Sequence, residues 1–150
     1  MKVAFLIPST TNKRENWLTA EDTYLWNILC QTLEYQCPDH NIKLFIGYDA
    51  ADRIYSDPEE RLKFSAVFTK FELEWFPQGN EMKGKVTSIW NNLGKEALLQ
   101  GYNYFKLLGD DIKMPSDTGW LGCFINKLKK NNNIGFSAGY SNNDNIPTQF

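Results

Sequence analysis

Asp110 and Asp111 are the residues of this chain best suited to bind a metal. They follow Tyr104–Leu108, a run rich in apolar residues that predicts a buried strand. Adjacent residues of an extended chain point in opposite directions, so one carboxylate can face a metal while the other faces a second ligand. Mg²⁺ and Mn²⁺ prefer carboxylate and phosphate oxygens. The pair predicts a site for a metal-bound phosphate, although Gly-Asp-Asp is also ordinary turn chemistry.

Three further residues could contact a nucleotide. Asp49 ends a second apolar run, where its carboxylate can accept a hydrogen bond from a base or a ribose hydroxyl. Lys83 and Lys85 stand just before a long predicted helix, whose first N–H groups and dipole favour a phosphate. Two alternatives remain open: Asp49 could be an ordinary loop acid, and Lys83 and Lys85 could belong to a solvated basic loop.

The elements that must position these residues alternate along the chain. Apolar runs and period-two patterns predict strands, and apolar residues spaced three and four apart predict helices. We expect strands at 3–7, 42–49, 71–75, 104–108 and 134–138, helices at 19–36, 84–100 and from Asp117, and a short helix after Asp57. This order predicts an α/β fold with a mostly parallel, Rossmann-like sheet and helices on both faces. The length of 150 residues suits a single domain, 1–150.

The expected topology also predicts where a ligand binds. In open α/β sheets, ligands bind beyond the carboxyl ends of the strands, so the segments that follow the strands should converge on one crevice. These segments contain Pro8, Ser9, Thr10, Thr11 and Asn12, then Asp49 and Asp52, then residues 79–85, and finally Asp110 and Asp111.

Composition argues against several other classes of protein. The net charge of −2, with acids and bases mixed along the chain, does not favour a nucleic-acid partner. The apolar run at the N-terminus is about five residues, too short for a membrane span or the core of a signal peptide, so no membrane segment is expected. Three cysteines fit no metal motif and suggest reduced thiols in the cytoplasm.

Four segments resemble the nucleotide-sugar-binding half of GT-A fold glycosyltransferases. They are Ile7-Pro8-Ser9-Thr10, Tyr48-Asp49, the stretch from Lys85 through Trp90-Asn91-Asn92-Leu93-Gly94-Lys95-Glu96-Ala97, and Leu107-Leu108-Gly109-Asp110-Asp111. Their order and spacing carry the resemblance, which covers about residues 1–140. In particular, the chain is similar to the capsid-associated glycosyltransferases of large algal DNA viruses, which would place it in the host cytoplasm.

The resemblance implies a metal-dependent glycosyltransferase that moves a sugar from a nucleoside-diphosphate donor, most often UDP-linked, to a hydroxyl of a glycan or glycoprotein acceptor. It implies Asp49 on the base, Asp110 on the ribose or sugar, and Asp111, with Asp110, on Mn²⁺ or Mg²⁺. Pro8, Ser9 and Thr10 would border the base. The helix-start argument given above for Lys83 and Lys85 agrees with a diphosphate in the donor.

Two departures from the family pattern leave alternatives open. Gly109 replaces the first acid of the commoner Asp-x-Asp motif. The family also continues well past the fifth strand with its acceptor site, so the resemblance implies that this chain is truncated there; Asp144 is the remaining candidate for a catalytic base. The alternative is a non-catalytic binding module that needs another chain or segment for the acceptor. A nucleotidyltransferase is disfavoured because residues 9–14 contain no glycine.

Overall fold

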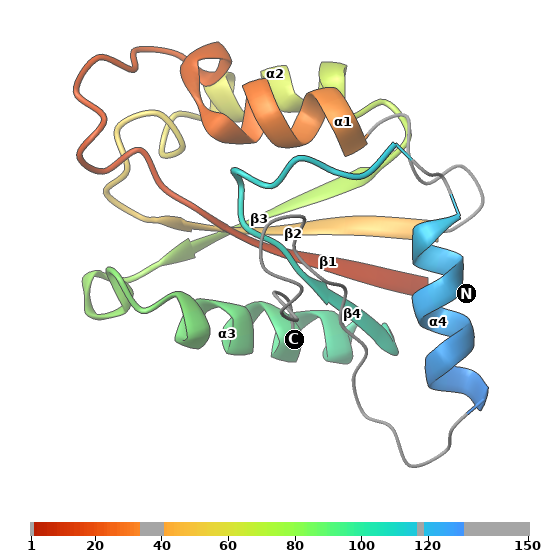
Figure 1. Ribbon diagram of the computed structural model, residues 1–150. Coiled ribbons are helices and arrows are strands. Elements are labelled where there is room, and N and C mark those ends of the chain that lie inside the picture. Colours follow the sequence, from red (N-terminus) through yellow and green to blue (C-terminus); the bar gives the residue numbers. More distant parts are fainter. Residues whose placement is uncertain (1, 34–40, 117–118, 131–150) are drawn as a thin grey trace, which may run out of the picture.

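Four parallel strands form the centre of the computed structural model, which describes residues 2–33, 41–116 and 119–130 (Figure 1). The strands are β1 (Lys2–Ser9), β2 (Asn41–Asp49), β3 (Glu72–Gln78) and β4 (Tyr104–Leu107), in the order β3-β2-β1-β4. The predicted α/β fold with a parallel sheet is therefore confirmed. The described residues contain four strands, and the predicted strand at 134–138 lies outside them.

The central strand β1 separates two apolar layers. Val3, Phe5 and Ile7 pack on one side and Ala4 and Leu6 on the other, and all five are almost completely buried. This accounts for the continuous apolar run, because a strand covered on both faces has no solvent-facing positions. α2 (Pro58–Val67) and α1 (Gln31–Leu33) cover the first face, and α3 (Val86–Leu99) covers the second, as Figure 1 shows.

The segment predicted as one helix over 19–36 has a different local form. It contains a 3-10 turn, η1 (Ala20–Asp22), then a π-helical segment, η2 (Leu25–Cys30), which runs into α1. Thr19 is the N-cap as expected, and its backbone N–H donates to the Asp22 carboxylate at 3.0 Å. The apolar spacing predicted the buried face correctly, but spacing alone does not distinguish wide from regular helical turns.

The remaining elements lie close to their predicted places. Asp57 caps α2 by accepting a hydrogen bond from the Glu59 N–H at 2.8 Å. β3 extends beyond the predicted 71–75 because its pairing with β2 continues to Gln78. A 3-10 turn, η3 (Asn80–Met82), links β3 to α3, and α4 (Trp120–Lys130) packs through Trp120 on the face that carries Phe5. The predicted cap at Asp117 lies outside the described residues.

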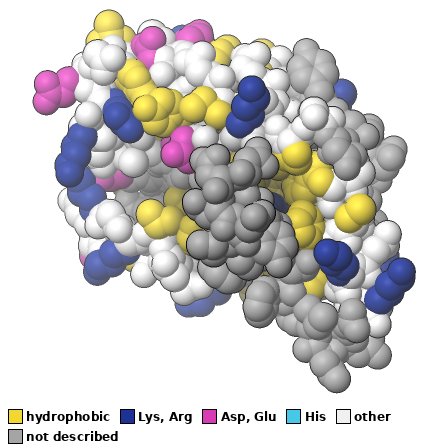
Figure 2. Space-filling view, viewed as in Figure 1, with side chains coloured by type: hydrophobic (Ala, Val, Ile, Leu, Met, Phe, Trp, Pro, Cys, Tyr) yellow, Lys and Arg dark blue, Asp and Glu magenta, His cyan; other side chains and the backbone are white. Residues whose placement is uncertain are grey.

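The surface has mixed charge. On the face drawn in Figure 2, Lys and Arg side chains are scattered among Asp, Glu and hydrophobic side chains. Within the part of the chain that the structure describes, none of the helices has the length and apolarity needed to cross a bilayer.

Candidate functional site

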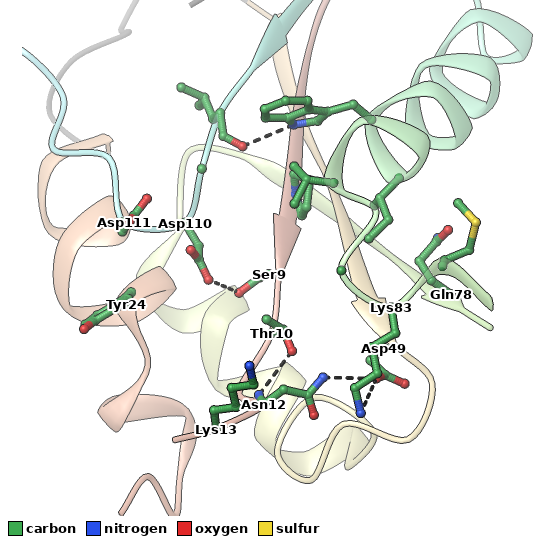
Figure 3. A pocket seen from close by; sticks show the side chains of 18 of the residues that line it. Ser9, Thr10, Asn12, Lys13, Tyr24, Asp49, Gln78, Lys83, Asp110 and Asp111 are labelled. Carbon is green, nitrogen blue, oxygen red and sulfur yellow. Dashed lines mark hydrogen bonds and ion pairs between the residues drawn. The ribbon is translucent and has the colours of Figure 1, made fainter. Parts of the chain in front are cut away.

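A pocket of about 1070 Å³ opens at the carboxyl ends of the four strands. Each strand contributes its last residues or the segment that follows it, so the expected convergence is observed (Figure 3). Asp110, Asp111 and Tyr24 lie on one side of the pocket, and Asp49, Gln78 and Lys83 lie on the other, with Ser9 and Thr10 between them. Of the predicted site residues, the pocket lining includes Pro8, Ser9, Thr10, Asp49, Lys83, Asp110 and Asp111.

Asp110 is held by a buried hydroxyl of β1. Its Oδ2 accepts a hydrogen bond from the Ser9 hydroxyl at 2.5 Å, and that hydroxyl also lies 2.8 Å from the Tyr55 hydroxyl. Ser9 has one proton, so when it donates to an ionised Asp110 it accepts from Tyr55. Burial raises the pKa of the Asp110 carboxyl, the neighbouring charge of Asp111 raises it further, and the Ser9 hydrogen bond opposes both effects. Tyr55 is completely buried, and burial raises the pKa of its phenol.

Asp111 is the exposed member of the acidic pair, and it also lines the pocket. Both aspartates lie in a turn beyond the end of β4 and not in extended chain, and a Cβ added to Gly109 would lie 2.8 Å from the Asp111 Oδ1. Among the described residues, no group of three or more His, Cys, Asp or Glu side chains gathers into a metal site. Two adjacent carboxylates still fit Mg²⁺ or Mn²⁺, because such ions take one or two carboxylates and complete their shell with phosphate and water.

Asp49 ends β2 and is fixed at the opposite side of the pocket. Its carboxylate accepts from the Ala51 N–H at 3.0 Å and from the Asn12 amide at 3.1 Å, and Lys83 lies 4.0 Å away. The Ala51 N–H, the Asn12 amide and the charge of Lys83 together lower the pKa of the Asp49 carboxyl. Asp49 is therefore an ionised hydrogen-bond acceptor in a fixed orientation.

Asp52 has a structural place, and the prediction that it faces the crevice is wrong. Its buried carboxylate accepts from the Thr11 N–H at 2.7 Å and the Thr11 hydroxyl at 2.9 Å. It also accepts from the Ile54 and Tyr55 N–H groups. Asp52 thus joins the loop after β1 to the loop after β2, and its hydrogen-bonding capacity is used inside the protein.

Among the predicted site residues that the structure describes, Lys85 is not brought to the pocket. Lys85 is an exposed N-cap residue of α3 and does not belong to the pocket lining, because the chain turns at Gly84, which has a φ of 75°. Asp144, the candidate base, lies outside the described residues.

Several lining residues were not predicted, among them Trp90, Tyr24 and Gln78. Trp90 closes the pocket from α3 by donating from Nε1 to the Leu6 carbonyl at 3.1 Å, and Tyr24 borders it from the opposite layer. Gln78 ends β3 and accepts from the Asn92 amide at 3.2 Å. Trp90 belongs to the apolar stripe of α3, and that stripe gave no sign that its indole faces a ligand site.

Comparison with known proteins leaves this pocket as the basis for function. No model of a protein family matches the chain, and no curated protein sequence does either.

Proposed function

We propose that this protein binds a nucleoside-diphosphate sugar, with UDP-linked donors favoured, and transfers the sugar to a hydroxyl acceptor with the help of Mn²⁺ or Mg²⁺. One observation carries the proposal: Asp49 and the Asp110–Asp111 pair line the same pocket from two different strand ends. The resemblance of the surrounding segments to GT-A glycosyltransferases gives the chemistry its direction.

The dimensions and lining of the pocket support a ligand of this kind. About 1070 Å³ lies at the upper end of the range typical of small-molecule sites. Apolar side chains such as Met82, Ile89 and Trp90 provide surface for rings, and hydrogen bonds fix the polar groups of Ser9, Asp49 and Asp110. Carboxylates at both sides suit a ligand with hydrogen-bond donors at one end and a metal-bound diphosphate at the other.

The residues take distinct parts in this proposal. Asp49 accepts a hydrogen bond from the base, and Lys83 beside it reduces the cost of holding that charge. Ser9 keeps Asp110 aimed into the pocket, where it contacts the ribose or sugar. Asp111 and Asp110 would hold the metal, which neutralises the charge that develops on the leaving diphosphate.

The test is a binding panel. Thermal unfolding and calorimetry with UDP, GDP, ADP and CMP, each with Mn²⁺ and with EDTA, should show stabilisation by UDP that requires the metal. A ligand at 100 times its dissociation constant adds about 2.7 kcal/mol to the free energy of unfolding. Equal stabilisation by UDP in Mn²⁺ and in EDTA would contradict the metal part of the proposal.

A non-catalytic binding module is the second candidate, and one observation favours it. The carboxylates that line the pocket in the described residues are Asp49, Asp110 and Asp111, and the donor side of the proposal uses all three. Release of UDP from UDP-sugars, with and without glycan acceptors, separates the candidates. We expect slow hydrolysis, because no lining carboxylate of the described residues is left to act as a general base, a role that contributes about 10²–10⁴-fold in rate. Asp144→Ala should change little; brisk acceptor-dependent turnover lost in that variant would show a complete enzyme.

A further inference from the structure

The loop that follows β1 holds the backbone of Arg14 firmly. The Arg14 N–H donates to the Thr11 carbonyl at 3.1 Å, and its own carbonyl accepts from the Trp17 N–H at 3.0 Å and from Arg53 Nη2 at 3.1 Å. The same Arg53 guanidinium also donates to the Trp17 carbonyl. The position of Arg14 is therefore determined by the fold, although its side chain is exposed.

Two aromatic rings orient the Arg14 side chain at the edge of the pocket. The guanidinium carbon lies 4.9 Å from the centre of the Tyr24 ring and 5.3 Å from that of Trp17. The rings meet edge to face at 4.8 Å, and Trp17 is buried. Cation–π contacts use the flat face of a guanidinium and leave its N–H groups pointing outward at the edge. No hydrogen bond or ion pair joins these N–H groups to another residue within the described ranges.

We propose that Arg14 is an anion-binding residue of the pocket, which contacts a phosphate or carboxylate group of the ligand, with Lys13 as a second cation beside it. The inference rests on the proposed function for the rest of the ligand, and it adds a second recognition point apart from the acidic pair. The planar fork of a guanidinium matches both anions and binds them through two parallel hydrogen bonds.

The charges of the pocket support an anion at this place. The lining contains the cations Lys13, Arg14 and Lys83 and the carboxylates of Asp49, Asp110 and Asp111. Lys83 faces Asp49 at 4.0 Å, whereas no described carboxylate lies within ion-pair distance of Lys13 or Arg14. A ligand anion can therefore approach Arg14 without displacing an internal partner.

Two parts of a sugar nucleotide could supply this anion. One is an oxygen of the diphosphate, and the other is the carboxylate of an acidic sugar such as a uronic acid. Calorimetry with Mn²⁺ distinguishes them when uridine, inorganic pyrophosphate, UDP-glucose and UDP-glucuronate are compared on the wild-type protein and on Arg14→Gln. Lys95→Gln is the matched control, because it removes a positive charge from an exposed residue of α3 outside this pocket.

We expect Arg14→Gln to weaken binding of the anionic ligands by about tenfold to a hundredfold, the range for a hydrogen bond to a charged group, and to leave uridine unchanged. A selective loss for UDP-glucuronate assigns a sugar carboxylate, and equal losses for both UDP-sugars and pyrophosphate assign a phosphate. Arg14→Lys should recover part of the affinity, because it keeps the charge without the fork.

The outcomes separate this inference from the proposed function. If no nucleotide binds but pyrophosphate does, and Arg14→Gln weakens it, the proposed function fails and the anion site stands. The inference is overturned if Arg14→Gln behaves like Lys95→Gln with every ligand, if uridine loses as much affinity as the anions, or if the wild-type protein binds none of the anionic probes.

Discussion

Asp110 combines a partly buried position with a charge that the fold does not favour. Burial raises the pKa of this carboxyl above the ordinary value of 3.8. The folded protein therefore binds the proton more readily than the unfolded chain does. Between the ordinary pKa and the raised one, stability falls as the pH rises, and at neutral pH the full cost of the ionised carboxylate is present. A site residue that destabilises the fold in this way has a reason for its place other than stability.

Replacing this carboxylate tests that conclusion. Asp110→Asn should stabilise the protein at pH 7 by about 0.5–2 kcal/mol, the range of typical stabilising substitutions, because the amide can still accept from Ser9 without a charge. The gain should shrink near pH 3.5, where the wild-type carboxyl is protonated. Thermal unfolding at both pH values measures it, with Glu15→Gln, which neutralises an exposed acid outside the pocket, as the control. Asp110→Asn no more stable than wild type at pH 7 would contradict the argument.

Substitutions of the acids on the two sides of the pocket should change nucleotide binding in different ways. Asp111→Asn removes a charge that the proposed metal site uses, so it should weaken the Mn²⁺-dependent binding of every nucleoside diphosphate. Asp49→Asn should mainly alter which base is preferred, because the amide presents donors where the carboxylate presented acceptors. Calorimetry with UDP, GDP, ADP and CDP checks this. Equal losses for all four nucleotides in both variants would refute the division of roles.

At the scale of elements, α3 reaches the pocket because β2 has a glycine beneath it. A Cβ at Gly47 would lie 2.6 Å from Ile89 Cγ2 and 3.2 Å from Leu93 Cδ1. Gly47→Ala should therefore destabilise the protein by about 1–3 kcal/mol and weaken UDP binding, because Ile89 also lines the pocket. Gly94→Ala is the control on the same helix. Its Cβ meets Leu6 at an ordinary 3.5 Å, so higher helix propensity should stabilise the protein. Denaturant titration measures whether each variant is more or less stable than the wild type, and calorimetry measures its affinity for UDP.

Trp90 joins the helix to the ends of β1 and β4. Trp90→Phe removes the indole N–H, which donates to the Leu6 carbonyl at 3.1 Å and to the Leu108 carbonyl at 3.4 Å. The Leu6 carbonyl still accepts from the Leu108 N–H at 3.0 Å. The free energy of unfolding should therefore fall by only about 0.5–1.5 kcal/mol. Nucleotide affinity should fall as well, because the indole forms part of the pocket wall. Unchanged affinity in Trp90→Phe would show that this wall does not touch the ligand.

The sequence predicted these elements well where the signal was periodic and local. The stripe of α3 and the apolar run of β1 define buried faces, and both lie where they were expected. The sequence did not predict that Leu25–Cys30 is π-helical, because π-helical and α-helical turns bury apolar residues at similar spacings. Tertiary hydrogen bonds could not be predicted from local patterns. The bond from the Thr11 N–H to the Asp52 carboxylate, for example, connects two loops that are 41 positions apart.

For the whole molecule, a metal held as proposed would need oxygens of the ligand to complete its shell. The described residues provide two adjacent carboxylates and no group of three or more metal-binding side chains. We therefore expect Mn²⁺ to bind weakly alone and much more tightly with UDP, and UDP to gain affinity by the same factor, since coupling is reciprocal. Titrations of each ligand at saturating and zero concentrations of the other measure both factors. Tight metal binding without nucleotide would contradict this prediction.

The location of the site was predictable because it follows from topology, whereas its details were not. Asp49 and Asp110 stand at strand ends, and parallel strands bring their carboxyl ends to one edge. Tyr24 and Arg14 depend on how a long loop folds back over that edge. Their contacts come from tertiary packing, which neither residue type nor spacing specifies.

The hydrogen bond between Ser9 and Asp110 spans 101 positions of the chain. β1 can pair with β2 once residues 41–49 have been made, but its pairing with β4 waits for residues 104–107. At translation rates of about 5–20 residues per second, the interval lasts several seconds. During synthesis, β2 and β3 can therefore pair while one edge of β1 has no partner strand. Ser9, at the carboxyl end of β1, likewise waits for Asp110. The acidic side of the pocket can consequently form only after the side that Asp49 provides.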